Sequence, residues 1–162
     1  LEGLRSTAAW GAAIRAKARG SVRSARGKPL VRYALTTDDV RLVRRGAQVL
    51  SELFFAAGAH TVAPGIIGSP STLGSIEEAR SLGTTGPLDA RAYSMSMTHL
   101  FGTARLGSNP STSVVGLDFE HHDVNGLFVA DSSVFPSNTG VNPMISIMAI
   151  AQRCATRVLE RS

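Results

Sequence analysis

The residues of this chain that are best suited to chemistry lie in its second half. His99 precedes a glycine-rich segment, and a neutral imidazole, with a pKa of about 6.5, can accept a proton near neutral pH. Asn142 stands directly before Pro143, and its amide can donate a hydrogen bond to an oxygen. Taken alone, each has an ordinary structural explanation: His99 as a satisfied structural histidine, and Asn142 as the N-cap of a helix that begins with Pro143.

Other patterns that could carry chemistry are weak or missing. His121, His122 and Asp123 are metal-ligand types, but adjacent residues on a turn rarely converge on one ion, and no HExxH motif accompanies them. We therefore predict a polar loop and no metal site. The sequence also lacks the G-x-S-x-G elbow, the P-loop and the dinucleotide-binding G-x-G-x-x-G motif. Cys154 is the only cysteine, which excludes an internal disulfide.

Composition and charge limit the classes of partner. The 162 residues are 43% hydrophobic and 18% charged, as in globular proteins. No apolar run approaches the ~18 residues of a membrane span, so we predict no transmembrane segment. The net charge of +5 lies entirely in residues 1–29, which hold seven basic residues and one acidic residue. Such a segment can bind a polyanion or an anionic membrane, but it is more often a solvated helix or linker. Without a reading helix or an aromatic platform, we predict no nucleic-acid partner.

Apolar spacing predicts the elements of the first half. Residues 28–35 alternate in the manner of a short strand. A helix is predicted over 37–57, because apolar residues recur there at helical spacing. Thr37 or Asp38 is the expected N-cap of this helix, and Gly58 ends it.

The second half is expected to alternate between loops and short elements. Residues 63–90 are rich in glycine and proline and are predicted as loop, with one helical turn capped by Ser75. Residues 93–98 are predicted as a strand that leads into His99. The apolar run 127–130 is predicted as a strand buried on both faces. A last helix is predicted over 143–160. Its expected apolar stripe consists of Ile145, Met148, Ala149, Ala155, Val158 and Leu159.

Three stretches match one protein family in residue types, order and spacing. The stretches are 99–107, 126–136 and 140–151. Together they closely resemble the carboxyl-terminal part of the glucose–methanol–choline (GMC) family of flavin oxidoreductases. The resemblance is strong over 98–160 and looser over 30–62, where a strand and a helix end in Phe-Phe-Ala-Ala-Gly-Ala-His. It is not detectable over 1–29.

The resemblance implies an α+β or α/β fragment, the carboxyl-terminal portion of a two-domain enzyme. Residues 30–126 would belong to the substrate-side domain, with part of an antiparallel sheet and a helix. Residues 127–162 would supply the last strand and last helix of the FAD-binding domain, and 1–29 stays unassigned as helix or linker. The cofactor would be FAD, held mainly by an amino-terminal portion of the same polypeptide. Because the chain begins with Leu1 and not Met, we expect it to be part of a longer polypeptide.

The roles of individual residues also follow from the resemblance. His99 would accept the hydroxyl proton of a small-molecule alcohol, and Asn142 would orient the alcohol oxygen while the hydride passes to FAD. The positive end of the last helix would stabilise the reduced flavin. The residues expected to border the flavin are Asp131, Ser132, Asn142, Pro143 and Met144.

Two further interpretations stay open from the sequence alone. The chain could be a truncated, inactive member of the family, or a basic binding module that acts through residues 1–29 and predicts salt-sensitive DNA binding. A strand–GxGxxG–helix unit encoded upstream of Leu1 would favour the enzyme. For the chain by itself we expect no activity, no stable FAD complex, and exposed apolar faces on the last strand and helix.

Overall fold

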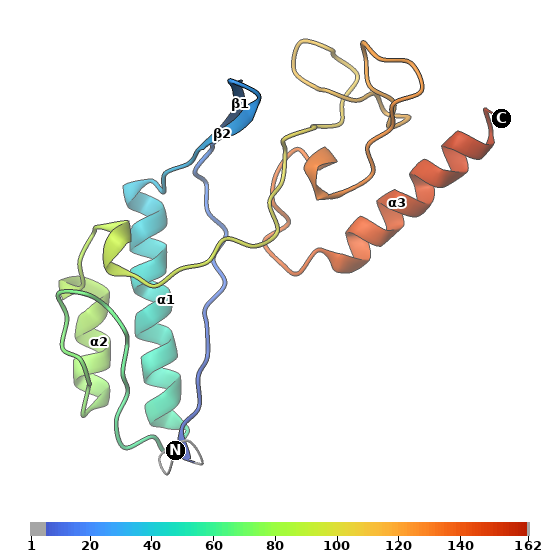
Figure 1. Ribbon diagram of the computed structural model, residues 1–162. Coiled ribbons are helices and arrows are strands. Elements are labelled where there is room, and N and C mark those ends of the chain that lie inside the picture. The colour runs from blue at the N-terminus through green and yellow to red at the C-terminus, as the bar shows by residue number, and fades with distance from the viewer. Residues whose placement is uncertain (1–5, 162) are drawn as a thin grey trace. The chain divides into compact units, whose positions relative to one another are not determined.

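The computed structural model describes residues 6–161, and its elements are those of an α+β protein. In chain order they are β1 (Ser21–Ala25), β2 (Lys28–Arg32), α1 (Thr37–Ala56), α2 (Ile76–Thr85) and α3 (Met144–Leu159) (Figure 1). The chain divides into two compact units, Leu1–Met95 and Ser96–Ser162. Residues 1–5 of the basic segment and Ser162 lie outside the described residues.

The strands β1 and β2 form an antiparallel hairpin, in which Ser21 pairs with Arg32. Its two-residue turn, Arg26 and Gly27, has φ values of 52° and 75°, as in the type I′ turn that matches the twist of paired strands. The predicted strand 28–35 therefore ends at Arg32. The expectation of helix or linker for the whole of residues 1–29 was wrong, because β1 lies there. With one large apolar side chain in five residues, β1 has little strand signal of its own.

Helix α1 begins at Thr37, and its N-cap is Thr36 and not Thr37 or Asp38 as predicted. The Asp39 amide donates to Thr36 Oγ1 at 3.1 Å, and the Thr36 amide donates to Asp39 Oδ2 at 3.0 Å, which makes a capping box. The Asp39 carboxylate also accepts the amides of Lys17 at 2.7 Å and Ala18 at 3.0 Å. One buried side chain thus fixes both the start of α1 and the segment before β1.

Burial and hydrogen bonding act in opposite directions on Asp39, whose side chain is 0% exposed. Burial raises the pKa of its carboxyl group. The hydrogen bonds lower it, the Lys17 amide most strongly and then those from Thr36 and Ala18, and they leave the pKa below its ordinary value. The carboxylate is therefore stabilised in its charged form, as a group with several donors must be when it leaves water.

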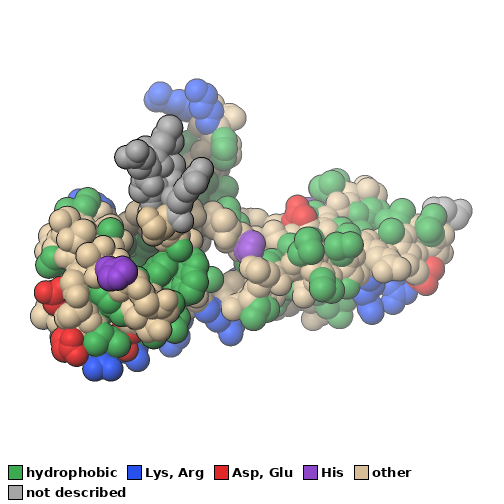
Figure 2. All heavy atoms as spheres, turned by 90° about the horizontal axis from the view of Figure 1, so that it is seen from below, with side chains coloured by type: hydrophobic (Ala, Val, Ile, Leu, Met, Phe, Trp, Pro, Cys, Tyr) green, Lys and Arg blue, Asp and Glu red, His purple; other side chains and the backbone are tan. Residues whose placement is uncertain are grey.

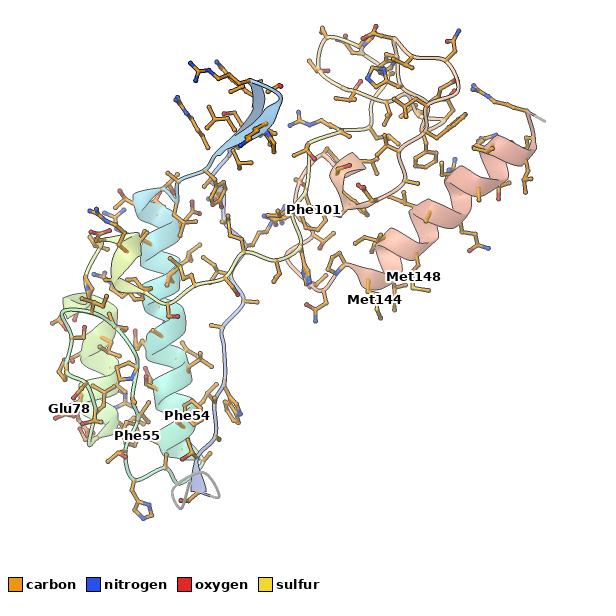
Figure 3. The ribbon with its side chains drawn as sticks, viewed as in Figure 1. Phe54, Phe55, Glu78, Phe101, Met144 and Met148 are labelled. Atoms are coloured by element: carbon orange, nitrogen blue, oxygen red, sulfur yellow. The ribbon has the colours of Figure 1, made fainter. Side chains whose placement is uncertain are left out.

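The first unit has its core between α1, α2 and the loops around them. The buried core residues are Val40, Val62, Ile66, Leu73, Ala79, Leu82, Ala92 and Tyr93. Ser75 caps α2, as predicted, by accepting the Glu78 amide at 3.2 Å, and Figure 3 shows Glu78 on this helix. The helix runs for ten residues and not one turn, because Ala79 and Leu82 pack into the core. Gly83 allows close approach to α1, since a Cβ there would lie 1.9 Å from Gln48 Oε1.

The second unit consists mostly of irregular backbone around a small core. Isolated bridges join Leu106 to Val115, Val115 to His121, and Glu120 to Phe128. Its buried hydrophobic residues are Val115, Phe119, Val134 and Cys154. Backbone hydrogen bonds between loops, and not a sheet, hold this unit in shape.

Both strands predicted for the second half are absent from the described residues. Of residues 93–98, only Tyr93 makes a bridge, to Ile66, and the stretch from 94 to 98 is exposed. Over 127–130 only Phe128 makes a bridge, and Leu127 is 45% exposed. A strand buried on both faces needs neighbouring strands and covering helices, and residues 6–161 supply neither here.

Helix α3 begins at Met144 with Pro143 as N-cap and without a side-chain cap, so the prediction of Asn142 as N-cap was wrong. Its inward face shares only Val158 with the predicted stripe. Cys154 is buried and Ile147, Ile150 and Val158 are half-buried, and burial raises the pKa of the Cys154 thiol.

The predicted stripe of α3 is mostly exposed. Ile145 is 77%, Met148 63% and Leu159 75% exposed. Met144, just before the stripe, is 68% exposed, and Figure 3 shows it on the same side of the helix as Met148. Figure 2 shows hydrophobic side chains along the second unit, which contains α3. The expectation of an exposed apolar face on the last helix is thus confirmed.

Across residues 6–161, no helix combines the length and the apolar character that crossing a bilayer requires.

We expect Asp39→Asn to lower the free energy of unfolding by about 2 kcal/mol, because it removes charge-assisted hydrogen bonds from a fully buried group. Since the folded pKa lies below the unfolded value, this stability is present above pH of about 4 and is lost as the pH falls through the folded pKa. Urea unfolding at neutral and acidic pH measures both effects. Asp38→Asn, in the same helical turn with an exposed side chain, is the matched control, and an equal loss in both variants would contradict the assignment.

Candidate functional site

The predicted proton acceptor, His99, lies on exposed irregular backbone in the second unit. Its ring makes no hydrogen bond to any residue between 6 and 161. Its φ is 57°, in the left-handed region that non-glycine residues seldom occupy. Such backbone costs on the order of 1 kcal/mol, and it is found preferentially at functional sites. The imidazole is therefore open to a ligand and held on an unusual backbone.

The segment after His99 is joined to the segment that ends in Pro136. The Ala104 amide donates to the Ser133 carbonyl at 3.1 Å, and the Leu106 amide donates to the Val134 carbonyl at 2.9 Å. Nearby, the rings of Phe101 and Phe135 meet edge to face with centroids 5.5 Å apart. Figure 3 labels Phe101 on this path. The first two matching stretches, which are far apart in sequence, thus form one structure.

Asp131 and Ser132 directly precede Ser133 and Val134, whose carbonyls make these contacts. Asp131 caps a 3-10 turn, Ser132–Val134, and its Oδ1 accepts the Ser133 amide at 2.7 Å. Asp131 is exposed and Ser132 half-buried, while Val134 anchors the turn in the core. The turn thus presents a carboxylate and a hydroxyl at the surface from a fixed base.

The start of α3 offers polar groups without protein partners. Asn142 is exposed, and its side chain makes no hydrogen bond with the described residues. Pro143 is buried and fixes the helix entry, and its carbonyl accepts the Ile147 amide at 2.8 Å. With no side-chain cap, the first amides of α3 stay available, and the helix dipole gives this end positive potential.

The other end of α3 is clamped to the loops. Arg161 donates to Glu120 and Asp118, and its guanidinium lies 5.9 Å from the Phe128 ring centroid. The hydrogen bond from the Gly126 amide, with that from Arg161, holds the pKa of Glu120 below its ordinary value. Sequence analysis missed this clamp, because a basic residue at a helix end has an ordinary explanation in the helix dipole.

The two adjacent histidines take separate partners. His121 Nδ1 accepts the Asp123 amide at 3.0 Å, and His122 Nε2 lies 2.9 Å from the Ser113 hydroxyl. That hydroxyl also contacts the Asn109 carbonyl at 2.7 Å. These contacts tie a polar loop together, as the sequence predicts. Among the described residues, no group of three or more metal-ligand side chains converges.

Comparison with known proteins identifies relatives of this chain. The family model described as GMC oxidoreductase matches residues 16–151. An uncharacterized GMC-type oxidoreductase of Mycobacterium tuberculosis is 34% identical over 154 residues, which cover 95% of this chain and 24% of that protein. A long-chain-alcohol oxidase of Arabidopsis thaliana is 31% identical over 92% of this chain and 21% of its own length. A 2-methyl-1,2-propanediol dehydrogenase of Mycolicibacterium austroafricanum is 36% identical over 52% of this chain and 16% of its own length.

The chain belongs to the GMC oxidoreductase family, and the resemblance in its three stretches is confirmed. The match also begins earlier than the sequence motifs indicate, because it includes residues 16–29, where no resemblance was expected. The chain spans about a quarter of the length of the first curated relatives it matches.

The left-handed backbone at His99 predicts an order of stability among variants. His99→Gly should unfold at a temperature equal to or above that of the unchanged chain, because glycine adopts positive φ without steric cost. His99→Val should unfold lower, since a β-branched residue fits this region poorly. Thermal melts followed by circular dichroism measure the order. Met97→Gly, at an exposed residue nearby, should be destabilising, and a His99→Val melt equal to the unchanged one would contradict the assignment.

Proposed function

We propose that this chain is the carboxyl-terminal portion of an FAD-dependent oxidoreductase that acts on the CH–OH group of an alcohol. The observation that carries the proposal is the hydrogen-bonded joining of residues 104–106 to 133–134. This union places the His99 segment and the Asp131 turn in one compact unit with the start of α3. It supports a single site to which the three matching stretches contribute.

The residues near the start of α3 fit a flavin neighbour. The uncapped amides of the first helical turn and the unpartnered Asn142 supply hydrogen-bond donors, and the exposed Met144 supplies an apolar surface. Positive potential at a helix N-terminus favours a negatively charged ring. Asp131 and Ser132 would lie along the border of the same cofactor. The diphosphate site would come from an amino-terminal portion of the polypeptide, because the glycine-rich turn that binds it is absent from the sequence.

The division of chemistry follows from the groups present. A bound FAD would supply the hydride acceptor, and the hydroxyl proton of the alcohol would need a base on the protein. The neutral His99 imidazole takes that proton, and its exposure without a protein partner leaves the ring free to face the substrate. The Asn142 amide donates a hydrogen bond to the substrate oxygen and holds it for transfer.

Two relatives bear names that refer to alcohols, a long-chain-alcohol oxidase and a 2-methyl-1,2-propanediol dehydrogenase, and they support a small-molecule alcohol substrate. Within the polypeptide, residues 30–126 would belong to the substrate side and 127–162 to the FAD side. The exposed apolar face of α3 would then pack against the amino-terminal portion.

In the flavin-loaded enzyme that contains this segment, His99→Ala should lower kcat by about 10²–10⁴-fold, because general-base loss has that size. Stopped-flow reduction of the flavin by the alcohol measures the step. Asn142→Ala should slow the same step, with flavin content unchanged. The matched controls are His60→Ala and Asn125→Ala, which remove exposed residues of the same types outside the site. A His99→Ala rate within a few-fold of the control rate would overturn the role.

The isolated 162-residue chain should retain no FAD. The donors near α3 can border a flavin ring, but the phosphate-binding turn is absent from the sequence. Gel filtration after incubation with FAD, read by absorbance of the protein peak in the flavin band, tests this expectation. A yellow peak with stoichiometric flavin would contradict the division of the site between two portions of the polypeptide.

A further inference from the structure

One dipeptide of the second unit can react with itself. Asn125 is the only one of the four asparagines in the sequence that precedes a glycine, and glycine has no Cβ to hinder attack of its amide nitrogen on the asparagine side chain. Asn109 and Asn142 precede prolines, which have no N–H to lose. Asn138 precedes a β-branched threonine, which crowds the same attack. The sequence thus favours spontaneous deamidation at Asn125 alone.

Deamidation at this dipeptide requires a ring closure. The Gly126 nitrogen loses its proton to solvent and bonds to Asn125 Cγ, and the side-chain nitrogen leaves as ammonia. Water then opens the cyclic imide at either of its two carbonyls, which yields aspartate or isoaspartate. No oxidant or cofactor takes part. The reaction therefore needs a free Gly126 amide and a backbone that lets Asn125 Cγ reach it.

The backbone of this turn keeps the two atoms apart. The Leu127 amide lies 3.4 Å from the Val124 carbonyl, and Gly126 has a φ of 77° while the φ of Asn125 is not positive. These are the features of a type II turn. In such a turn ψ of the first central residue is about +120°, which directs the Gly126 nitrogen away from the Asn125 side chain.

The Gly126 amide is also held by a carboxylate. It donates to Glu120 Oε1 at 2.7 Å. This hydrogen bond, with that from Arg161, lowers the pKa of Glu120, so the carboxylate is a poor acceptor for the amide proton. A negative charge on the Gly126 nitrogen would also be repelled by the carboxylate beside it. The contact therefore withdraws the nitrogen from the reaction.

Arg161 fixes Glu120 from the carboxyl end of α3. Its guanidinium donates to both Glu120 and Asp118, and Glu120 forms a bridge to Phe128 beyond the turn. The Asn125 side chain itself is exposed and has no hydrogen-bond partner within residues 6–161. Protection of the dipeptide thus rests on the Gly126 amide and on the docking of the last helix.

We propose that Asn125 is a latent deamidation site, which the docked carboxyl end of α3 keeps closed through Arg161 and Glu120. When that end is released, Gly126 loses its acceptor and the turn can change its ψ, so the dipeptide reacts. Isoaspartate lengthens the backbone of the turn, and a molecule that has reacted in this way does not restore the same contact. This proposal is independent of the proposed enzymatic function.

The test is incubation of the 162-residue chain, folded or unfolded in guanidinium chloride, in slightly alkaline buffer made with heavy-oxygen water. Only product formed during the incubation carries the label, and peptide mapping by mass spectrometry measures it at each asparagine. Asn125 should react at least about tenfold more slowly in the folded chain, because a hydrogen bond to a charged acceptor must first break. Asn138, the internal reference, should stay largely unmodified in both states. Equal rates for Asn125 in the two states would overturn the proposal.

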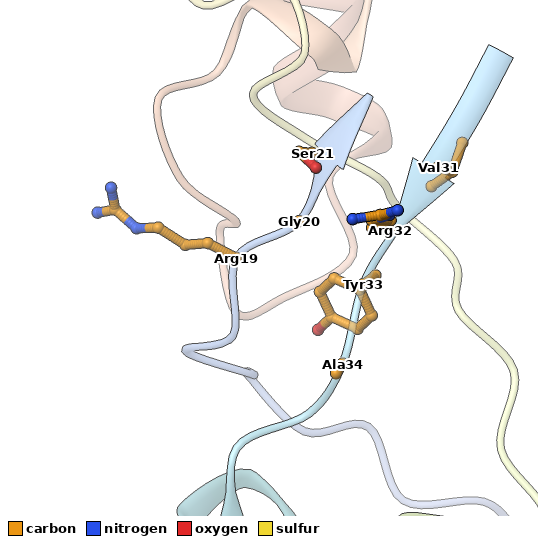
Figure 4. A pocket seen from close by; sticks show the side chains of 7 residues that line it. All are labelled: Arg19, Gly20, Ser21, Val31, Arg32, Tyr33 and Ala34. Atoms are coloured by element: carbon orange, nitrogen blue, oxygen red, sulfur yellow. The ribbon is translucent and has the colours of Figure 1, made fainter. Parts of the chain in front are cut away.

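Variants of the clamp test its part in this protection. Glu120→Ala removes the acceptor and should raise the folded-state rate at Asn125 by about tenfold, and Arg161→Gln should raise it several-fold. Two controls should leave the rate unchanged. Arg157→Gln breaks another ion pair at the same end of α3, and Arg32→Gln removes an arginine of the groove in Figure 4 that forms no ion pair within residues 6–161.

A second measurement does not depend on the folding of any variant. Hydrogen exchange of the Gly126 amide, followed by NMR in the unchanged chain, reports its contact with Glu120 directly, and we expect slow exchange. Circular dichroism shows which variants keep their fold. Fast exchange of the Gly126 amide, an unchanged rate in folded Glu120→Ala and Arg161→Gln, or an equal rise in Arg157→Gln would each overturn the proposal.

Discussion

The candidate site depends on one short set of backbone hydrogen bonds, those that join residues 104–106 to 133–134. The second unit has no sheet among its described residues, so its peptide groups must find partners between loops. These bonds, with the edge-to-face contact of Phe101 and Phe135 and the buried Val134, supply such partners. They fix the backbone that follows His99 and the backbone that follows Asp131. Without them, the polar residues of the site would lie on unconnected loops.

The two ends of α3 have different physical roles. Arg161 clamps the carboxyl end to Glu120 and Asp118, and Glu120 also accepts the Gly126 amide. The amino end has a buried Pro143, and its first amides and the Asn142 side chain have no hydrogen-bond partner within residues 6–161. A helix anchored at one end and open at the other can present its positive dipole to a ligand. The long exposed apolar face between the ends agrees with a chain that spans a quarter of its relatives' length.

Local patterns predicted the helices well and the strands poorly. Signals that lie within one or two helical turns of sequence, apolar spacing and capping residues, predict the helix over 37–57 with its end at Gly58 and the Ser75 cap. The strands predicted over 93–98 and 127–130 fail, because an apolar run becomes a strand only when other strands pair with it. The hairpin partner β1 was missed for the opposite reason: its five residues pair well but carry little apolar signal. Asn142 has the residue type of an N-cap, but the backbone makes Pro143 the cap and leaves the Asn142 amide free.

The sequence by itself determined the family, because three stretches of fixed residue type and spacing are specific even when each alone is weak. It also singled out His99 and Asn142, since few other side chains of this chain suit proton transfer and alcohol binding. Only the tertiary structure decided which polar side chains of the chain are left without a hydrogen-bond partner. The Asp39 carboxylate accepts hydrogen bonds from four donors, and His122 Nε2 lies 2.9 Å from the Ser113 hydroxyl. Within residues 6–161, the His99 ring and the Asn142 side chain have no hydrogen-bond partner. The reason is that the hydrogen-bond partners of a side chain often come from distant parts of the sequence, and a local sequence pattern cannot predict them.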